Sequence, residues 1–196
     1  MIEIKNIKGS VTVAVLPEYS LDAVEHACTL KNLDCRRYDN FIVVFCPGKL
    51  RWSCFKRRYQ QPAKTIHINV TGCRSIEAFE RGVQEVFVFL EGLIEPQEHT
   101  VKIDNITAVS KLNQCFTPPL PLKSIKERLD AETHFQCRLN PEAFSALCVQ
   151  TPDCTGLLYH SGTLVLMGTK SIVVSHQFVV QLSACLARSL EETMIL

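Results

Sequence analysis

The stretch VTGCRS at residues 70–75 and its echo LMGTKS at residues 166–171 decide the fold of this chain. In each, a glycine ends a run of alternating side chains, and a serine three positions later is suited to begin a helix. Each copy therefore marks the change from a strand to a long helix. The two copies begin 96 positions apart, at residues 70 and 166.

A second pair of echoes has almost the same spacing. Ile4-Lys5-Asn6-Ile7 matches Ile103-Asp104-Asn105-Ile106, 99 positions later, and each copy opens a strand-like segment. Two matched landmarks at nearly one offset indicate a tandem duplication, and so long a period is typical of two half-domains. We expect a first repeat at residues 1–95 and a second at residues 96–196, joined near the sequence EPQE at 95–98.

Both repeats show the same order of elements: a strand, a short helix, an antiparallel meander and a long helix. Such halves can join their meanders into one sheet whose helices cover one face, which is an α+β fold with an open second face. Ser20 and Ser75 are the predicted N-caps of the two helices in the first repeat. In that repeat we expect strands at 4–15, 38–46, 50–58 and 65–71, with helices at 21–30 and 75–93. In the second we expect a strand from 101, strands at 144–149, 156–159 and 163–167, and helices at 121–129 and 171–191.

The open face of the predicted sheet is polar in the first repeat and more apolar in the second. Alternation along residues 65–71 places Asn69 and Thr71 on that face, and the matching strand places Val165 and Met167 there. A wide face with many small groups and two pseudo-symmetric asparagines predicts an elongated ligand. A duplex minor groove is such a ligand, because its base edges offer hydrogen-bond acceptors to asparagine amides.

Composition narrows the class of protein. A hydrophobic content of 46% with 21% charged residues is typical of a folded chain rather than a disordered one. No apolar run reaches the roughly 18 residues of a membrane span, and the start shows no export signal, so export is not expected. The net charge of +1 does not by itself call for nucleic acid. The ten cysteines include no CxxC pair, so we expect reduced thiols that fill space and no metal site.

The paired NI strands and the VTGCRS and LMGTKS ends together resemble the TATA-box-binding protein family, over roughly residues 2–190. The chain diverges in many places, so it looks like a TATA-binding-protein-like factor. The resemblance implies one curved antiparallel sheet, a saddle, with helices on its convex face. It also implies that the concave face binds and bends promoter DNA through the minor groove, by wedging aromatic side chains between base steps.

The resemblance carries over to four wedge positions. Tyr38 and Phe55 match the first pair, with Tyr59 as a rival to Phe55, and Phe144 and Tyr159 match the second. Without the family, these rings would be ordinary core or cross-strand aromatics.

The asparagines Asn6 and Asn105 match the family's central hydrogen-bonding residues, although either could be a strand-end residue. The resemblance places phosphate-facing cations at Arg37, Arg74 and Lys170. Residues 1–95 hold thirteen Lys and Arg against eleven acids, and residues 96–196 hold eight against nine. Phosphate contacts should therefore favour the first repeat.

Further expectations concern partners. Glu142 matches a contact to transcription factor IIB, so we expect a factor of that kind and RNA polymerase as partners, with no metal or small cofactor. The resemblance implies a location in the nucleus, or in a virion or viral factory if the chain is viral.

No nucleophile, base and orienting residue cluster in sequence, so an enzyme is the weaker class. The main alternative is a module of the same fold that has lost DNA binding and acts only through proteins. The run Arg51, Lys56, Arg57 and Arg58 reads as a solvated hairpin more readily than as a phosphate contact, and His67 with Cys73 is a weak metal candidate.

Overall fold

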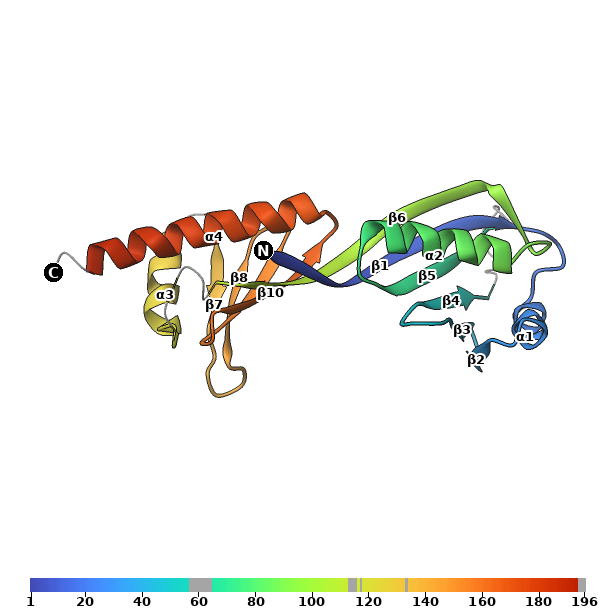
Figure 1. The fold of residues 1–196 in the computed structure, drawn as a ribbon, viewed down its shortest axis with the longest axis horizontal. Helices are drawn as coiled ribbons and strands as arrows, with labels where there is room; N and C mark the ends of the chain where they lie inside the picture. Colours follow the sequence, from blue (N-terminus) through green and yellow to red (C-terminus); the bar gives the residue numbers. More distant parts are fainter. Residues whose placement is uncertain (57–64, 113–115, 117, 133, 194–196) are drawn as a thin grey trace. The chain divides into compact units, whose positions relative to one another are not determined.

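The computed structural model describes residues 1–56, 65–112, 116, 118–132 and 134–193 (Figure 1). The chain divides into two compact units. The first-repeat unit spans Asn6–Asp104, and the second-repeat unit combines Met1–Lys5 with Asn105–Leu196. The expected repeats at 1–95 and 96–196 describe the duplication in sequence. The units are divided elsewhere because each of two long strands, β1 (Ile2–Val15) and β6 (Ile94–Lys111), contributes residues to both.

The same order of elements occurs twice, as strand, helix, four strands and helix. The first set is β1, α1 (Leu21–Leu30), β2 (Asp34–Arg37), β3 (Phe41–Phe45), β4 (Arg51–Phe55), β5 (Thr65–Cys73) and α2 (Ile76–Phe89). The second set is β6, α3 (Leu122–Leu129), β7 (Gln136–Arg138), β8 (Ala146–Gln150), β9 (Thr155–Tyr159), β10 (Thr163–Thr169) and α4 (Ile172–Thr193).

The strands follow the order β2-β3-β4-β5-β1-β6-β10-β9-β8-β7 in one antiparallel sheet. The predicted α+β class is therefore confirmed. The expected meander of three strands per repeat was wrong, because β2 and β7 add a fourth. Both are edge strands of only four and three residues, with exposed or half-buried side chains. Such short edge strands show no run of alternating apolar residues, so the sequence pattern does not reveal them.

Alternation along β5 builds the core of the first-repeat unit. Ile66, Ile68 and Val70 are buried beneath α2, while the residues between them face away. The Trp52 ring of β4 meets the Phe89 ring of α2 at 5.1 Å between centroids. Each fully buried side chain of this size contributes about 1.5–3 kcal/mol of burial free energy.

The predicted caps of both helices in this unit are confirmed. Ser20 Oγ accepts from the Ala23 amide at 3.0 Å and thereby begins α1. Ser75 Oγ accepts from the Ala78 amide at 3.1 Å and begins α2. Each bond satisfies an amide that the helix leaves unpaired at its first turn.

The second-repeat unit buries α3 and α4 against its own strands. Phe178 and Leu182 of α4 pack in one apolar cluster with Leu158, Leu164 and Leu166 of β9 and β10. In each unit the helices thus cover one face of the strands, and the other face is left open. We call that second face the open face.

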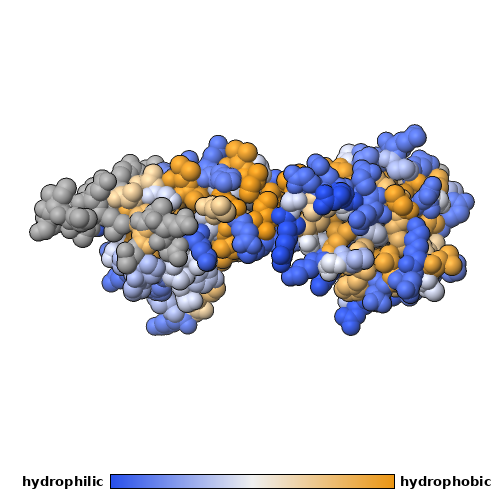
Figure 2. Space-filling model, viewed as in Figure 1, coloured by the Kyte–Doolittle hydropathy of each residue, from blue (hydrophilic) through white to orange (hydrophobic). Residues whose placement is uncertain are grey.

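Apolar side chains are also exposed along α4 (Figure 2). Val173 is 59% exposed and Val180 is 66% exposed. Seven residues separate them, so they share one side of the helix. Within the described part of the chain, each helix is too short or too polar to cross a membrane.

Candidate nucleic-acid interface

An asparagine amide is held in place at the end of β5 by a glycine with positive φ. Gly72 has φ +93°, and its amide donates to Asn6 Oδ1 at 2.8 Å. The Thr71 hydroxyl donates to the same oxygen at 3.3 Å. The pairing of β1 with β5 shifts register at this point, between Ile7 and Gly9. A positive φ suits glycine because it has no Cβ.

The second-repeat unit has the same arrangement. Gly168 has φ +81°, and its amide donates to Asn105 Oδ1 at 2.7 Å. Asn105 Nδ2 donates to the Thr107 hydroxyl at 3.2 Å. Here, too, the register shifts, between Leu166 and Thr169 of β10.

The backbone amides determine which way each asparagine side chain is turned. An N–H group must meet an acceptor, so the oxygen of each amide faces the glycine and the NH₂ group is turned the other way. Asn6 and Asn105 are both half-buried on the open face. Each therefore offers a hydrogen-bond donor in a fixed orientation, which is what reading a groove acceptor requires.

Three aromatic rings cluster on the open face of the first-repeat unit, at the opposite end of the strands from Asn6. Tyr38 stacks on Phe41 at 4.5 Å between centroids, and Phe41 lies 5.4 Å from Phe55. Tyr38 is 41% exposed, and the other two are half-buried. Tyr19 Oη donates to the Phe55 carbonyl at 2.8 Å and fixes the end of β4.

Two rings occupy the equivalent end of the second-repeat unit. Phe144 and Tyr159 meet edge to face at 6.1 Å between centroids. Phe144 is 45% exposed, because it ends a tight turn in which its amide donates to the Asn140 carbonyl at 2.8 Å. Ala146 is the cross-strand partner of Tyr159. Its small side chain leaves these two rings without a third ring of the kind that Phe41 supplies in the other unit.

The centre of the open face differs between the units. In the first-repeat unit, the strand registers align Val43, Ser53, Asn69 and Ser10 in one row across β3, β4, β5 and β1. Ser10 Oγ donates to Asp104 Oδ1 at 3.2 Å, which adds a carboxylate to that row. This row is mostly polar.

The matching row of the second-repeat unit is mostly apolar. The registers align Cys148, Leu157, Val165 and Val109 across β8, β9, β10 and β6. All four are half-buried. The predicted contrast between a polar first repeat and a more apolar second repeat is therefore present in the structure.

The comparisons with known proteins agree with this architecture. Residues 100–189 match the model of the family described as transcription factor TFIID, or TATA-binding protein (TBP).

The second repeat of this chain is therefore similar to the TATA-binding protein family.

A solved TBP from Methanococcus jannaschii has the same fold. It aligns with a TM-score of 0.67 and 20% identity, over 94% of this chain and 97% of that chain. Two further solved structures are much less similar. A regulatory domain of aspartate kinase from Porphyromonas gingivalis aligns with a TM-score of 0.26 and 7% identity, over 94% of each chain. A regulatory subunit of aspartate kinase from Thermus thermophilus aligns with a TM-score of 0.25 and 8% identity, over 85% of this chain and 84% of that chain. Among curated proteins, no sequence matches this chain.

The three predicted phosphate-facing cations lie in two kinds of environment. Arg74 and Lys170 are exposed and stand at equivalent positions, each just before the serine that precedes a long helix. Arg37 instead lies on the helix-covered side of β2, opposite Ile42 in the register. Its guanidinium pairs with Asp22 at 3.0 Å and with Glu25 at 3.5 Å, both on α1.

Arg37 remains a candidate phosphate contact although it forms these ion pairs. Both are partly solvated, and pairs of this kind contribute only about 0.2–1 kcal/mol. A phosphate could therefore compete for Arg37, which stays a predicted contact. Arg36, which is next in sequence, faces the open side, because its register partner is Val43.

The remaining predicted residues are also placed by the structure. Asn69, Thr71, Val165 and Met167 lie half-buried on the open face. Glu142 is exposed in the turn between β7 and β8, where a partner protein could reach it. Tyr59, the rival wedge, and Arg57 and Arg58 of the basic run lie outside the described residues.

Sequence analysis missed Phe41 and Asp104. The signal for Phe41 was the alternation of Phe41, Val43 and Phe45, but treating 38–46 as one strand hid the turn that stacks Tyr38 on it. Asp104 stands beside Asn105 and had no distinguishing pattern. Only the pairing of β1 with β6 within the first-repeat unit brings Ser10 to its carboxylate. The Arg51 guanidinium lies 5.4 Å from the centroid of the Phe45 ring, so this member of the basic run has an aromatic neighbour.

Several of the cysteines are buried, as expected of thiols that fill space. The nine that the structure describes form no disulfide with one another, and Cys28, Cys54 and Cys154 are among the buried ones. Burial raises the pKa of the Cys54 thiol to about 12 and that of Cys154 to about 11. Such thiols stay protonated near neutral pH and are poor nucleophiles.

Proposed function

We propose that this chain is a DNA-binding transcription initiation factor that binds promoter DNA through the minor groove and bends it. The match of residues 100–189 to a family of transcription factors and the fold shared with a solved TBP support this proposal. We assign it no catalytic reaction and no small-molecule cofactor. We place it in the nucleus, or in a virion or viral factory if the chain is of viral origin.

The observation that carries the proposal is a pair of features that both units share. Each unit holds an asparagine amide against a positive-φ glycine at one end of its open face. Each also presents partly exposed aromatic rings at the other end of the same strands. A solvent-facing sheet gains no stability from exposed rings, so their repetition favours a ligand that covers them.

The chemistry of these features fits a minor groove. The fixed NH₂ groups can donate to adenine N3 and thymine O2, which face the groove at every A·T pair. The exposed rings can enter between base pairs, where unstacking costs a few kcal/mol and the bent duplex then covers more protein surface. Exposed cations such as Arg74 and Lys170 would neutralise flanking phosphates.

The polar row of the first-repeat unit supports a preference for certain base pairs in its DNA half-site, which the second-repeat unit does not share. The Asp104 carboxylate is an acceptor, so it would repel the acceptors of an A·T pair and accept from the guanine amine of a G·C pair. The apolar row through Val165 can only lie against the groove floor. We therefore expect the half-site under the first repeat to tolerate G·C better.

Replacing guanine by inosine tests this preference, because inosine lacks only the minor-groove amine. Inosine in the half-site of the first repeat should weaken binding, and Asp104→Asn should reduce that loss. Inosine in the other half-site should have little effect. Equal A·T demand in both half-sites, found by selection from a random duplex library, would contradict the expectation.

We propose a factor related to transcription factor IIB and RNA polymerase as protein partners. Glu142 is the candidate contact for the first, since it is exposed beside the predicted wedge Phe144. The exposed Val173 and Val180 on α4 are available to a second protein on the helix-covered side.

Bending is the property to measure. A duplex labelled at both ends with a fluorescence-transfer pair should shorten when the chain binds, and Phe144→Ala should restore much of the end-to-end distance. Phe45→Ala is the matched control, because it removes an aromatic ring from the open face away from the predicted wedges. An end-to-end distance that is the same for Phe144→Ala and the unaltered chain would refute wedging by this ring.

A second candidate function is a TATA-binding-protein-like module that no longer binds DNA and acts as a platform for proteins. The Asp104 carboxylate on the open face and the pairing of Arg37 with α1 favour it. A salt titration separates the two functions. DNA binding should weaken steeply as salt rises, because counterions are released from neutralised phosphates. No binding to any duplex at low salt would favour the platform.

A further inference from the structure

Three side chains of types that bind metals meet on the helix-covered side of the second-repeat unit. Glu132, His134 and Cys185 each offer one ligand atom, and these atoms all lie within 4.8 Å of one another. Oxygen, nitrogen and sulfur are thus available at one point. The thiol is only 6% exposed, so the cluster extends from the surface to the edge of the core.

Packing on both sides of the cluster fixes where these residues lie. Cys185 belongs to the face of α4 that packs in the same core cluster as Leu129, the last residue of α3. The chain turns directly after α3, since the Glu132 amide donates to the Leu129 carbonyl at 3.0 Å. Phe135, which is 5% exposed, anchors the far side of the turn with its ring 6.0 Å from that of Phe178.

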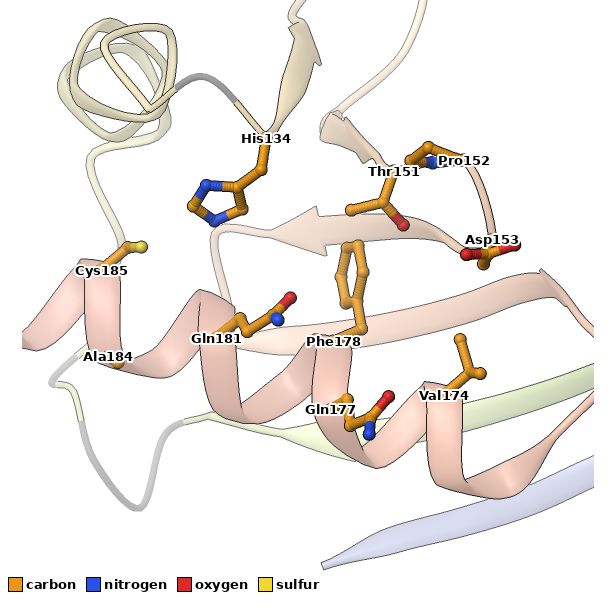
Figure 3. Close-up of a pocket in the computed structure, with 10 residues that line it drawn as sticks. All are labelled: His134, Thr151, Pro152, Asp153, Val174, Gln177, Phe178, Gln181, Ala184 and Cys185. Atoms are coloured by element: carbon orange, nitrogen blue, oxygen red, sulfur yellow. The ribbon is translucent and has the colours of Figure 1, made fainter.

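A cavity opens beside the cluster (Figure 3). It has a volume of about 480 Å³, and His134 and Cys185 are among its lining residues, together with Asp153 and Gln181. Figure 3 shows the His134 ring and the Cys185 sulfur directed into this space from opposite sides. The His134 side chain is 46% exposed, so its ring can turn, and solvent can reach the cluster from the cavity.

The ligand set selects among metals. Calcium and magnesium prefer oxygen alone, whereas one thiolate, one imidazole and one carboxylate are typical zinc ligands. Zinc bonds of about 2.0–2.3 Å in a tetrahedron require closer ligand atoms than 4.8 Å. Small rotations of the Glu132 and His134 side chains, both partly exposed, can supply the difference. His134 Nδ1 is already 4.0 Å from Glu132 Oε2.

We propose that Glu132, His134 and Cys185 bind Zn²⁺, with water from the cavity as the fourth ligand. On binding, Cys185 loses its thiol proton to solvent and His134 coordinates as neutral imidazole, so affinity rises with pH. The metal would join the turn after α3 to α4 and stabilise the second-repeat unit. Cysteine spacing in the sequence did not predict this site, because its ligands are brought together by tertiary packing.

Metal binding is measured on the full chain after chelator treatment. Zn²⁺ is titrated against a chromophoric chelator, and Co²⁺ is used as a spectroscopic probe. We expect one Zn²⁺ per chain, an absorption band from charge transfer between thiolate and Co²⁺, and a higher unfolding temperature with zinc. Cys185→Ser should abolish the band, and His134→Ala should weaken zinc binding by about tenfold or more.

Cys148→Ser is the matched control, because it removes a half-buried thiol from the open face of the same unit. It should leave the band and the affinity unchanged. His134→Ala keeps the test valid if Cys185→Ser does not fold, since it alters a half-exposed side chain. The proposal is overturned if no Zn²⁺ binds, if Co²⁺ gives no thiolate band, or if His134→Ala binds zinc as the unaltered chain does.

Discussion

Replacing Asn6 by Asp separates the structural role of this side chain from its predicted role in the groove. The carboxylate keeps the oxygen that accepts from the Gly72 amide at 2.8 Å and from the Thr71 hydroxyl at 3.3 Å. The folded chain should therefore lose little stability. What disappears is the NH₂ group, and a negative charge then faces the acceptors of the groove.

The magnitudes follow from these contacts. Asn6→Ala removes the acceptor for a half-buried amide, which should lower the free energy of unfolding by about 1–3 kcal/mol. Asn6→Asp should lower it by less than about 0.5 kcal/mol. A lost base contact is worth about 1–3 kcal/mol, so Asn6→Asp should bind an A·T-rich duplex roughly 5-fold to 150-fold more weakly.

Two measurements at one salt concentration separate the two roles of Asn6. Fluorescence anisotropy of a labelled duplex gives the affinity, and urea unfolding gives the stability. The reasoning fails if Asn6→Asp binds the duplex as tightly as the unaltered chain, because the amide then donates nothing to DNA. It also fails if Asn6→Asp and Asn6→Ala destabilise the fold equally, because the oxygen then does not hold the glycine amide.

Three further predictions concern stability. Tyr19→Phe leaves the Phe55 carbonyl without its donor at 2.8 Å, so the free energy of unfolding in urea should fall by about 1–3 kcal/mol; an unchanged midpoint would refute the bond. Gly156→Ala adds a Cβ that would lie 2.6 Å from the Phe178 ring, and this overpacking should cost about 1–3 kcal/mol in the same assay. Burial raises the pKa of Cys54 from 9.0 to about 12, so this thiol ionises at a lower pH in the unfolded chain than in the folded chain. The stability that the buried, neutral thiol contributes is therefore intact below about pH 9 and is lost as pH rises towards 12. Alkaline titration of the unfolding midpoint tests this, and Cys54→Ala should flatten the fall.

Much of the candidate site could be predicted from the sequence, because the duplication places equivalent residues at equivalent positions. Alternation along β5 and β10 predicted that Asn69 and Val165 face away from the helices, and the structure places them there. Periodicity of two residues assigns a face to every residue of a regular strand. It says nothing of how a ring outside the strand is turned, so the stacking of Tyr38 on Phe41 was not foreseen.

The sequence by itself determined the repeated order of elements, the capping serines and the two faces of the central strands. These depend on local pattern, in which neighbouring residues decide the backbone conformation. Only the tertiary structure decided that Arg37 pairs with α1, that Asp104 meets Ser10, and that Glu132, His134 and Cys185 converge. Each of these contacts joins residues that are distant in sequence or on different elements, and strand register and helix packing bring such residues together.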